Sequence, residues 1–240
     1  MSITERIIAH RGASAYSPEN TLAAFAKAGA MGCPVVEFDV MLSADLQPFV
    51  FHDDALSRTT GARGEFSSAT AAFISRLSAG SWFADIYHNE KIPTLHETIQ
   101  LLTAKNMQAN IEIKPVNGMI EQTVSIILGE ILRYWPYDKP LPLVSSFDVN
   151  ALKLCRSIAP EMPLGLLLDA WQDNWLSVAK QLSCFSVHIN QRVLNARRVS
   201  LVKATKHKLF AYTVNHKRRA NQLLSWGVDA IFSDYPDLLA

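Results

Sequence analysis

The chain has 240 residues, of which 49% are hydrophobic and 19% are charged, and its formal net charge is +1. This composition is typical of a globular protein with enough apolar residues for one large core. A net charge close to zero gives no strong electrostatic field, so we expect neither nucleic acid nor an anionic membrane surface as a partner.

The N-terminal segment and the cysteines indicate a cytoplasmic protein. Residues 1–6 have no long apolar core and no small-residue cleavage site, so we expect no secretory signal. No segment approaches the roughly 18 apolar residues of a membrane-spanning helix, so we expect no stable membrane insertion. Cys33, Cys155 and Cys184 are odd in number and far apart, which favours reduced thiols over disulfides.

Short β-rich runs alternate with longer segments that carry apolar residues at helical spacing. In chain order, we predict strand 6–10, helix 21–31, strand 35–40, helix 94–105, strand 108–113, helix 119–135, strand 143–145, helix 149–157, strand 164–168, helix 171–182, strand 185–189, helix 196–206, strand 209–214, helix 218–226 and strand 230–233. Asn20 and Thr21 are the predicted caps of the first helix. This alternation predicts an α/β protein with a parallel sheet, and the number of strands favours a closed (β/α)8 TIM barrel over an open doubly wound sheet.

One stretch interrupts this alternation. Residues 48–51 form a further strand-like run that ends at His52, and the segment from 53 to 91 then separates it from the next helix. Loops that follow barrel strands are usually much shorter, so a long insertion at this place indicates a function. We therefore expect a single domain over residues 1–240, with a small lobe at about 53–91 over the mouth of the barrel. The alternative is an insertion without a functional role.

Acidic residues lie in two otherwise apolar strands. Glu37 and Asp39 are two positions apart, so their side chains point to the same side of the strand, and Glu112 lies near the end of the next barrel strand. Active-site residues of TIM barrels lie at the C-terminal ends of the strands. Three carboxylates that converge there could bind one divalent cation, Mg²⁺ or Ca²⁺. The alternative is that they form structural ion pairs with Arg11 and Lys114.

Two histidines also lie at predicted strand ends, His10 after the first strand and His52 after the run 48–51. An unperturbed imidazole titrates at about pH 6.5, so the pair could act as general acid and general base. Arg11 and Lys114 add positive charge suited to a phosphate group. A cation, paired imidazoles and basic side chains together predict phosphodiester cleavage.

Several short motifs resemble those of the glycerophosphodiester phosphodiesterase family, in the family's order and spacing from one end of the chain to the other. The motifs are His10-Arg11-Gly12, Pro18-Glu19-Asn20-Thr21, Glu37-Phe38-Asp39-Val40, His52-Asp53, Arg58-Thr59-Thr60-Gly61, Ile92-Pro93-Thr94-Leu95, Ile111-Glu112-Ile113-Lys114, Thr213-Val214-Asn215, Gly227-Val228-Asp229 and Ser233-Asp234-Tyr235-Pro236. One departure is Leu77-Ser78-Ala79-Gly80, where the family often has Leu-Asp-Ala-Gly. That change lies in the insertion and could alter the preferred substrate.

The resemblance implies a TIM barrel with the insertion as a lobe, and metal-dependent hydrolysis of a small-molecule glycerophosphodiester to sn-glycerol 3-phosphate and an alcohol. The implied site residues are Glu37, Asp39 and Glu112 as ligands of one divalent cation, His10 and His52 as the acid–base pair, and Arg11, Lys114 and Glu19 as residues that bind or orient the substrate. For Glu19, a structural role at the start of the first helix is an equal alternative. The sequence leaves open which imidazole is the acid, and whether the nucleophile is water or the 2-hydroxyl of the substrate. A barrel of this size could form a homodimer, although no motif specifies one.

Two alternatives to this function remain at the sequence level. Phospholipases of the phosphatidylinositol-specific or sphingomyelinase D type also pair two histidines in a barrel. They act at membranes, and the chain has no basic amphipathic helix suited to a membrane surface. The other alternative is a barrel that binds phosphodiesters without cleaving them, against which the full set of candidate catalytic residues argues.

Overall fold

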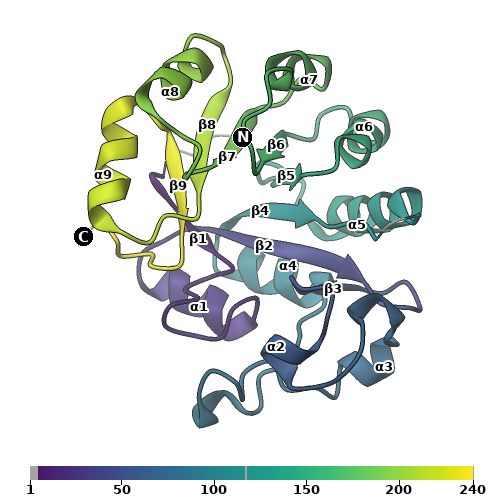
Figure 1. The fold of residues 1–240 in the computed structure, drawn as a ribbon. Coiled ribbons are helices and arrows are strands. Elements are labelled where there is room, and N and C mark those ends of the chain that lie inside the picture. The colour runs from purple at the N-terminus through teal and green to yellow at the C-terminus, as the bar shows by residue number, and fades with distance from the viewer. Residues whose placement is uncertain (1–4, 117, 240) are drawn as a thin grey trace.

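The computed structural model describes residues 5–116 and 118–239, and in this part of the chain eight parallel strands close into a barrel surrounded by helices (Figure 1). The barrel strands are β1 (Ile7–His10), β2 (Val35–Leu42), β4 (Gln108–Ile113), β5 (Leu143–Ser146), β6 (Leu164–Leu168), β7 (Ser186–Asn190), β8 (Lys208–Tyr212) and β9 (Ala230–Ser233). The barrel is closed because β1 pairs in parallel with both β9 and β2. The predicted TIM barrel is confirmed, and the open sheet is excluded.

The outer helices follow the strands as the hydrophobic pattern predicts. They are α1 (Leu22–Ala30), α4 (Leu95–Ala104), α5 (Ile120–Tyr134), α6 (Val149–Ile158), α7 (Trp175–Gln181), α8 (Ala196–Lys203) and α9 (Lys217–Trp226). Helix α7 begins four residues later than predicted, because residues 173 and 174 form a turn and the Trp171 indole donates to Asp173 Oδ1 at 3.2 Å. No helix of the described residues is both long and apolar enough to span a membrane.

Apolar side chains fill the space between the strands and the outer helices, and a smaller group fills the interior of the barrel. In the interior, Ile8, Val35, Leu143 and Phe210 belong to one buried cluster. Ile8, Val35 and Leu143 come from the first two residues of their strands, so they occupy the N-terminal end of the barrel. Any ligand must therefore enter from the C-terminal ends of the strands, as in other TIM barrels.

Between β2 and α4, the chain forms a strand and four short helical segments. These are β3 (Pro48–Val50), which pairs antiparallel with β2, then α2 (Ser57–Thr60), η1 (Phe66–Ser68), α3 (Ala71–Ile74) and η2 (Asp85–Tyr87). Phe51, Leu56, Phe66 and Ile74 are buried in a hydrophobic cluster separate from that of the barrel. In Figure 1, α2 and α3 lie beside the end of β2, away from the barrel axis. The division of the chain into a barrel and a lobe at 53–91 stays a prediction, which this separate cluster supports.

The turn after β1 has a backbone that few residues can adopt. Arg11 has φ 55° and Gly12 has φ 82°, both in the left-handed region. A Cβ atom on Gly12 would lie 2.7 Å from the carbonyl carbon and the Cβ of Ala24 in α1. The turn therefore requires glycine for conformation and for space, and it directs the backbone N–H of Arg11 to Glu37 Oε2 at 3.1 Å.

Replacing Gly12 with Ala should lower the free energy of unfolding by at least about 2 kcal/mol, because the new methyl group adds a backbone clash to the unfavourable φ. Urea denaturation of the variant measures this loss. Gly129→Ala is the matched control, since a Cβ at Gly129 in α5 meets no atom within 4 Å and its helical position should gain about 0.5–1 kcal/mol. Equal stability of the two variants would contradict this account of the turn.

Candidate active site

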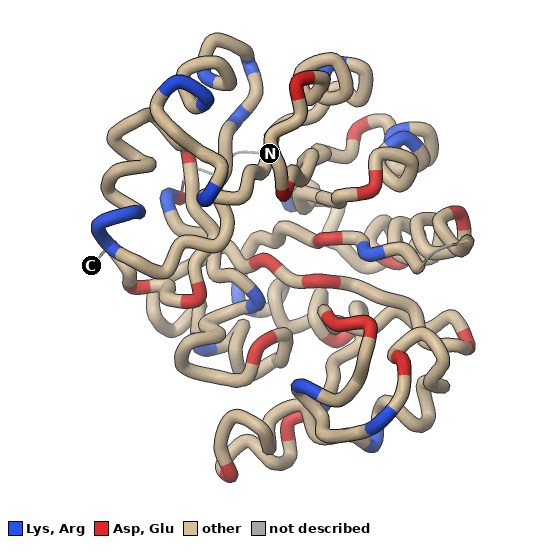
Figure 2. Tube along the Cα trace, in the orientation of Figure 1, with Lys and Arg blue, Asp and Glu red and all other residues tan. Residues whose placement is uncertain are grey.

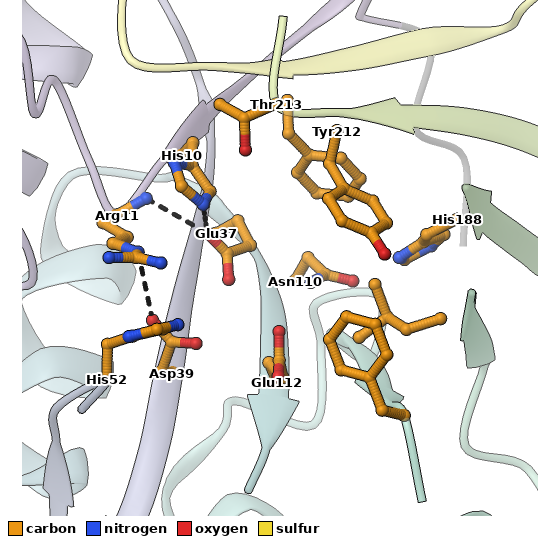
Figure 3. A pocket seen from close by; sticks show the side chains of 13 residues that line it. His10, Arg11, Glu37, Asp39, His52, Asn110, Glu112, His188, Tyr212 and Thr213 are labelled. Atoms are coloured by element: carbon orange, nitrogen blue, oxygen red, sulfur yellow. Dashed lines mark hydrogen bonds and ion pairs between the residues drawn. The ribbon is translucent and has the colours of Figure 1, made fainter. Parts of the chain in front are cut away.

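The barrel contains a cavity of about 190 Å³, which is lined by residues of its strands and of the segments that follow them (Figure 3). Of the eight predicted site residues, the following line this cavity: His10, Arg11, Glu37, Asp39, His52 and Glu112. Lys114 lines a neighbouring hollow that shares Glu112, and Glu19 lies behind Arg11. The structure thus brings together residues from β1, β2, β4 and the segment that follows β3.

The three acidic residues form one buried cluster. Each of Glu37, Asp39 and Glu112 offers a carboxylate oxygen within 4.8 Å of the others. Asp39 and Glu112 are register partners on β2 and β4, and the red segments on these strands lie close together in Figure 2. Two-residue spacing on β2 places Glu37 on the same side as Asp39, as predicted from the sequence.

The electrostatics of this cluster favour a cation. Burial, with Asp39 and Glu112 nearby, raises the pKa of Glu37 well above its usual value. Burial and the charge of Asp39 raise the pKa of Glu112 to about 8. Burial alone would also raise the pKa of Asp39, but Arg11 and then His52 outweigh it and lower that pKa. Three ionised carboxylates at this spacing repel one another unless a positive charge lies between them. A set of ligands that are all oxygens fits a hard divalent cation.

Basic side chains flank the acidic cluster. Arg11 Nε lies 3.5 Å from Asp39 Oδ2, and Arg11 Nη1 donates to Glu19 Oε1 at 2.7 Å. Lys114 Nζ lies 3.8 Å from Glu112 Oε1. The ion pairs considered as the alternative to a cation site are therefore present, and they coexist with the convergence of the carboxylates.

Each of the two histidines is held by a carboxylate. The Nδ1 atom of His10 is 2.7 Å from Asp234 Oδ1, and Asp234 also accepts hydrogen bonds from Ser14 Oγ and Asn215 Nδ2. The Nδ1 atom of His52 is 2.6 Å from Asp53 Oδ1. A carboxylate partner fixes the proton on Nδ1, so Nε2 of each neutral imidazole is free to accept a proton.

Arg58 of α2 connects the two halves of the site. It donates to both carboxylate oxygens of Asp53, the partner of His52, and to both oxygens of Glu19, the partner of Arg11. Burial alone would raise the pKa of Asp53, but hydrogen bonds from Arg58 and His52 lower it to about 2. Two carboxylates and one guanidinium thus hold the imidazole of His52 and the guanidinium of Arg11 in fixed positions.

Sequence reasoning missed several residues of this network. Asn20 was predicted as a helix cap, but Thr21 caps α1 and the side chain of Asn20 donates to Asp39 Oδ2 at 3.0 Å. Asp53 and Arg58 stand in motifs noted above, yet no role follows from their spacing alone. Asp234 lies 224 positions from His10, and no local pattern could pair them.

Comparison with known proteins decides the family. The model of the glycerophosphoryl diester phosphodiesterase family matches residues 10–238. The chain belongs to this family. A glycerophosphodiester phosphodiesterase of Caldanaerobacter subterraneus subsp. tengcongensis is 32% identical over 234 residues, which cover 97% of this chain and 95% of the relative. One from Bacillus subtilis is 31% identical over 247 residues, which cover 96% and 84%.

A solved structure is also similar to this chain over nearly its whole length. It is that of an Oleispira antarctica phosphodiesterase in complex with the product sn-glycerol-3-phosphate, and it superposes with a TM-score of 0.94 at 40% identity, covering 97% of this chain and 94% of that one. Family membership over nearly the whole chain confirms the resemblance predicted from the short motifs. The family is one of phosphoric diester hydrolases, so the chain is an enzyme by homology.

Proposed function

We propose that the protein hydrolyses glycerophosphodiesters to sn-glycerol 3-phosphate and an alcohol, in a reaction that requires one divalent cation. The observation that carries this proposal is the buried cluster of Glu37, Asp39 and Glu112 in the same cavity as His10 and His52. Family membership and the product named for the Oleispira antarctica phosphodiesterase support the substrate class.

In this proposal, positive charge meets the phosphate from two sides. Mg²⁺ or Ca²⁺ held by the three carboxylates would neutralise charge that develops on a non-bridging phosphoryl oxygen. The guanidinium of Arg11, fixed by Glu19 and Asp39, can donate to a second phosphoryl oxygen. Lys114 lines the neighbouring hollow and adds a positive charge beside Glu112. Glu19 acts as a positioning residue, because it touches Arg11 and Arg58 and does not line the main cavity.

The two imidazoles supply proton transfer. His10 is our candidate for the general base and His52 for the general acid that protonates the departing alkoxide. Each is oriented by a carboxylate at Nδ1, and each faces the cavity. Burial lowers the pKa of His52, which favours loss of its proton to the leaving group, although Asp39 opposes this effect. Water and the 2-hydroxyl of the substrate both remain candidate nucleophiles.

A cytoplasmic location also stays a proposal. The cysteines Cys33, Cys155 and Cys184 are all free and buried, which suits a reducing compartment. Burial raises the pKa of Cys184 to about 11 and that of Cys155 to about 12, so neither is a reactive thiolate near neutral pH. The predicted homodimer has no further support in the structure of the single chain.

Incubation of the purified protein with sn-glycero-3-phosphocholine and Mg²⁺ or Ca²⁺ should release sn-glycerol 3-phosphate, which a coupled dehydrogenase assay measures. A chelator should abolish the release, and added cation should restore it. Intact phosphatidylinositol and sphingomyelin form the comparison series. Faster cleavage of an intact lipid would favour the phospholipase alternative, and tight binding of the diester without product would favour a non-catalytic barrel.

A further inference from the structure

Three buried polar atoms on one side of the cavity have no hydrogen-bond partner among the described residues. They are Asn110 Oδ1, His188 Nδ1 and Tyr212 Oη, and all three side chains line the same cavity as the acidic cluster. Asn110 is 1% exposed and His188 is fully buried. Buried polar atoms nearly always have partners, because the unpaired atom loses its bonds to water and gains none in return. Three such atoms in one cavity therefore indicate a place where a polar ligand binds.

These atoms lie away from the groups assigned to the phosphate. In Figure 3, the hydroxyl of Tyr212 points toward the ring of His188, and Asn110 lies between them and the acidic residues. Arg11 and His52 lie on the opposite side of the view. The three side chains come from β4, β7 and β8, and all three line the cavity in the barrel.

Hydrogen bonds and ring contacts outside the cavity hold the side chains of Asn110 and His188 in place. Asn110 Nδ2 donates to Ser145 Oγ at 3.0 Å, which directs Oδ1 away from that serine. The other ring nitrogen of His188 is 2.8 Å from Ser186 Oγ. The His188 ring centroid is 5.1 Å from that of Phe210 and 5.1 Å from that of Phe232.

Two neighbours complete this arrangement. A Cβ atom at Gly165 would lie 2.6 Å from His188 Cε1, so this glycine leaves the space that the imidazole occupies. The ring of Tyr212 packs edge-on against Phe147, with the centroids 5.9 Å apart. The polar atoms are therefore preorganised, as a ligand subsite requires.

The three groups are uncharged. Burial lowers the pKa of His188 to about 3, and burial followed by Asp169 raises the pKa of Tyr212, so both are neutral over the physiological range. Asn110 Oδ1 is an acceptor, the Tyr212 hydroxyl can donate, and His188 Nδ1 does one or the other according to its tautomer. Such a set suits an alcohol hydroxyl, which both donates and accepts. It does not suit a phosphate, which needs cationic donors, or a quaternary ammonium group, which has no hydrogen to donate.

We propose that Asn110, His188 and Tyr212 form a subsite for the terminal hydroxyl of the glycerol moiety. This inference rests on the proposed function and fixes the direction of the substrate. The glycerol end would enter the inner part of the barrel, and the departing alcohol would face the mouth, where Phe147 is 46% exposed. Discrimination would then act on the glycerol part, which all glycerophosphodiesters share, while the alcohol could vary.

The test compares two substrates and two variants. The substrates are sn-glycero-3-phosphocholine and its analogue with 2-hydroxypropyl in place of glycerol, which lacks only the terminal hydroxyl and keeps the 2-hydroxyl that could take part in the reaction. In the wild-type protein, we expect kcat/KM for the analogue to be about 10-fold lower, because its hydroxyl no longer satisfies the subsite. This arm of the test depends on no variant.

Tyr212→Phe removes one hydroxyl and keeps the ring that packs on Phe147. We expect this variant to lose about 10-fold in kcat/KM with the full substrate. Its kcat/KM values for the two substrates should differ by no more than about 3-fold, because the variant and the analogue remove the same interaction from opposite sides, as in a double-mutant cycle. Tyr134→Phe, at the end of α5 and outside the cavity, is the matched control and should keep the wild-type ratio. Circular dichroism checks that both variants fold.

The outcomes separate the subsite from the proposed function. Normal turnover of sn-glycero-3-phosphocholine with the same ratio in wild type and Tyr212→Phe would overturn the subsite alone, and would mean that water satisfies these atoms. An absence of turnover with both substrates in the presence of Mg²⁺ and Ca²⁺ would instead contradict the proposed function, and the subsite with it.

Discussion

Replacing Glu112 with Gln should lower kcat/KM for sn-glycero-3-phosphocholine by about 1000-fold, since a bound cation supplies several kcal/mol of charge stabilisation and about 4 kcal/mol corresponds to this factor. The carboxamide keeps the shape of the side chain and removes the charge that a cation requires. Isothermal titration calorimetry with Ca²⁺ or Mg²⁺ should show a matching loss of affinity. An unchanged affinity for the cation would exclude Glu112 as a ligand.

The cation-free protein gives an independent check on this prediction. Because burial and Asp39 raise the pKa of Glu112 to about 8, the group carries a proton at neutral pH before the cation binds. Cation binding should therefore release a proton, and the affinity should rise as the pH increases through this value. Calorimetry in two buffers of different ionisation enthalpy measures the release.

A control variant separates loss of the cation site from loss of the fold. Gln is close in shape to a protonated Glu, so Glu112→Gln should leave the free energy of unfolding of the cation-free protein within about 0.5 kcal/mol of wild type. Glu130→Gln is the matched control. Glu130 lies on α5, away from the cavity, and burial raises its pKa as well. It should leave both cation binding and turnover unchanged.

Replacing His52 with Ala should lower kcat by roughly 100-fold or more, with a smaller effect on KM, because a group that transfers a proton in the transition state typically contributes 10²–10⁴-fold. Steady-state kinetics with sn-glycero-3-phosphocholine measure both constants. The same variant should lose less activity with a glycerophosphodiester that carries p-nitrophenol as its alcohol. The p-nitrophenolate ion is a good leaving group, so its departure needs no protonation.

His88→Ala is the control for this prediction. His88 follows η2 in the same insertion, and its Nδ1 atom lies 2.9 Å from the backbone oxygen of Asp85, outside the cavity. Wild-type kinetics are expected for it. Undiminished turnover of a folded His52→Ala variant would reject a proton-transfer role, and equal losses with both leaving groups would assign His52 a role other than general acid.

The fold was predictable because its signals are local. Apolar runs such as Leu164–Leu168 are separated by helical segments. Each such strand can be predicted from the residues of its own run, without knowledge of the rest of the chain. The start of α7 was wrong because the sequence between Trp171 and Trp175 continues the apolar spacing of the helix, although a turn interrupts it. Closure of the barrel could be inferred only from the number of strands, since no residue of β1 indicates that it pairs with β9.

The candidate site was predictable as far as single strands fix the direction of a side chain. The two-residue spacing of Glu37 and Asp39 was sufficient to place both in one cavity, since β2 is regular there. The hydrogen-bond partners were not predictable in this way. Asp234 follows β9 and contacts His10, and Tyr212 lines the cavity from β8. Both are far from His10 in the chain, and their roles depend on closure of the barrel.

The double contact of Arg58 has a consequence for how freely the insertion can be exchanged. Its guanidinium forms ion pairs with two carboxylates, that of Glu19 in the segment after β1 and that of Asp53 at the start of the insertion. A segment transplanted from a relative would leave both acids without this neutralising group unless it brings an arginine to the same place. An exchange of this segment that preserves both ion pairs must therefore keep an arginine at position 58.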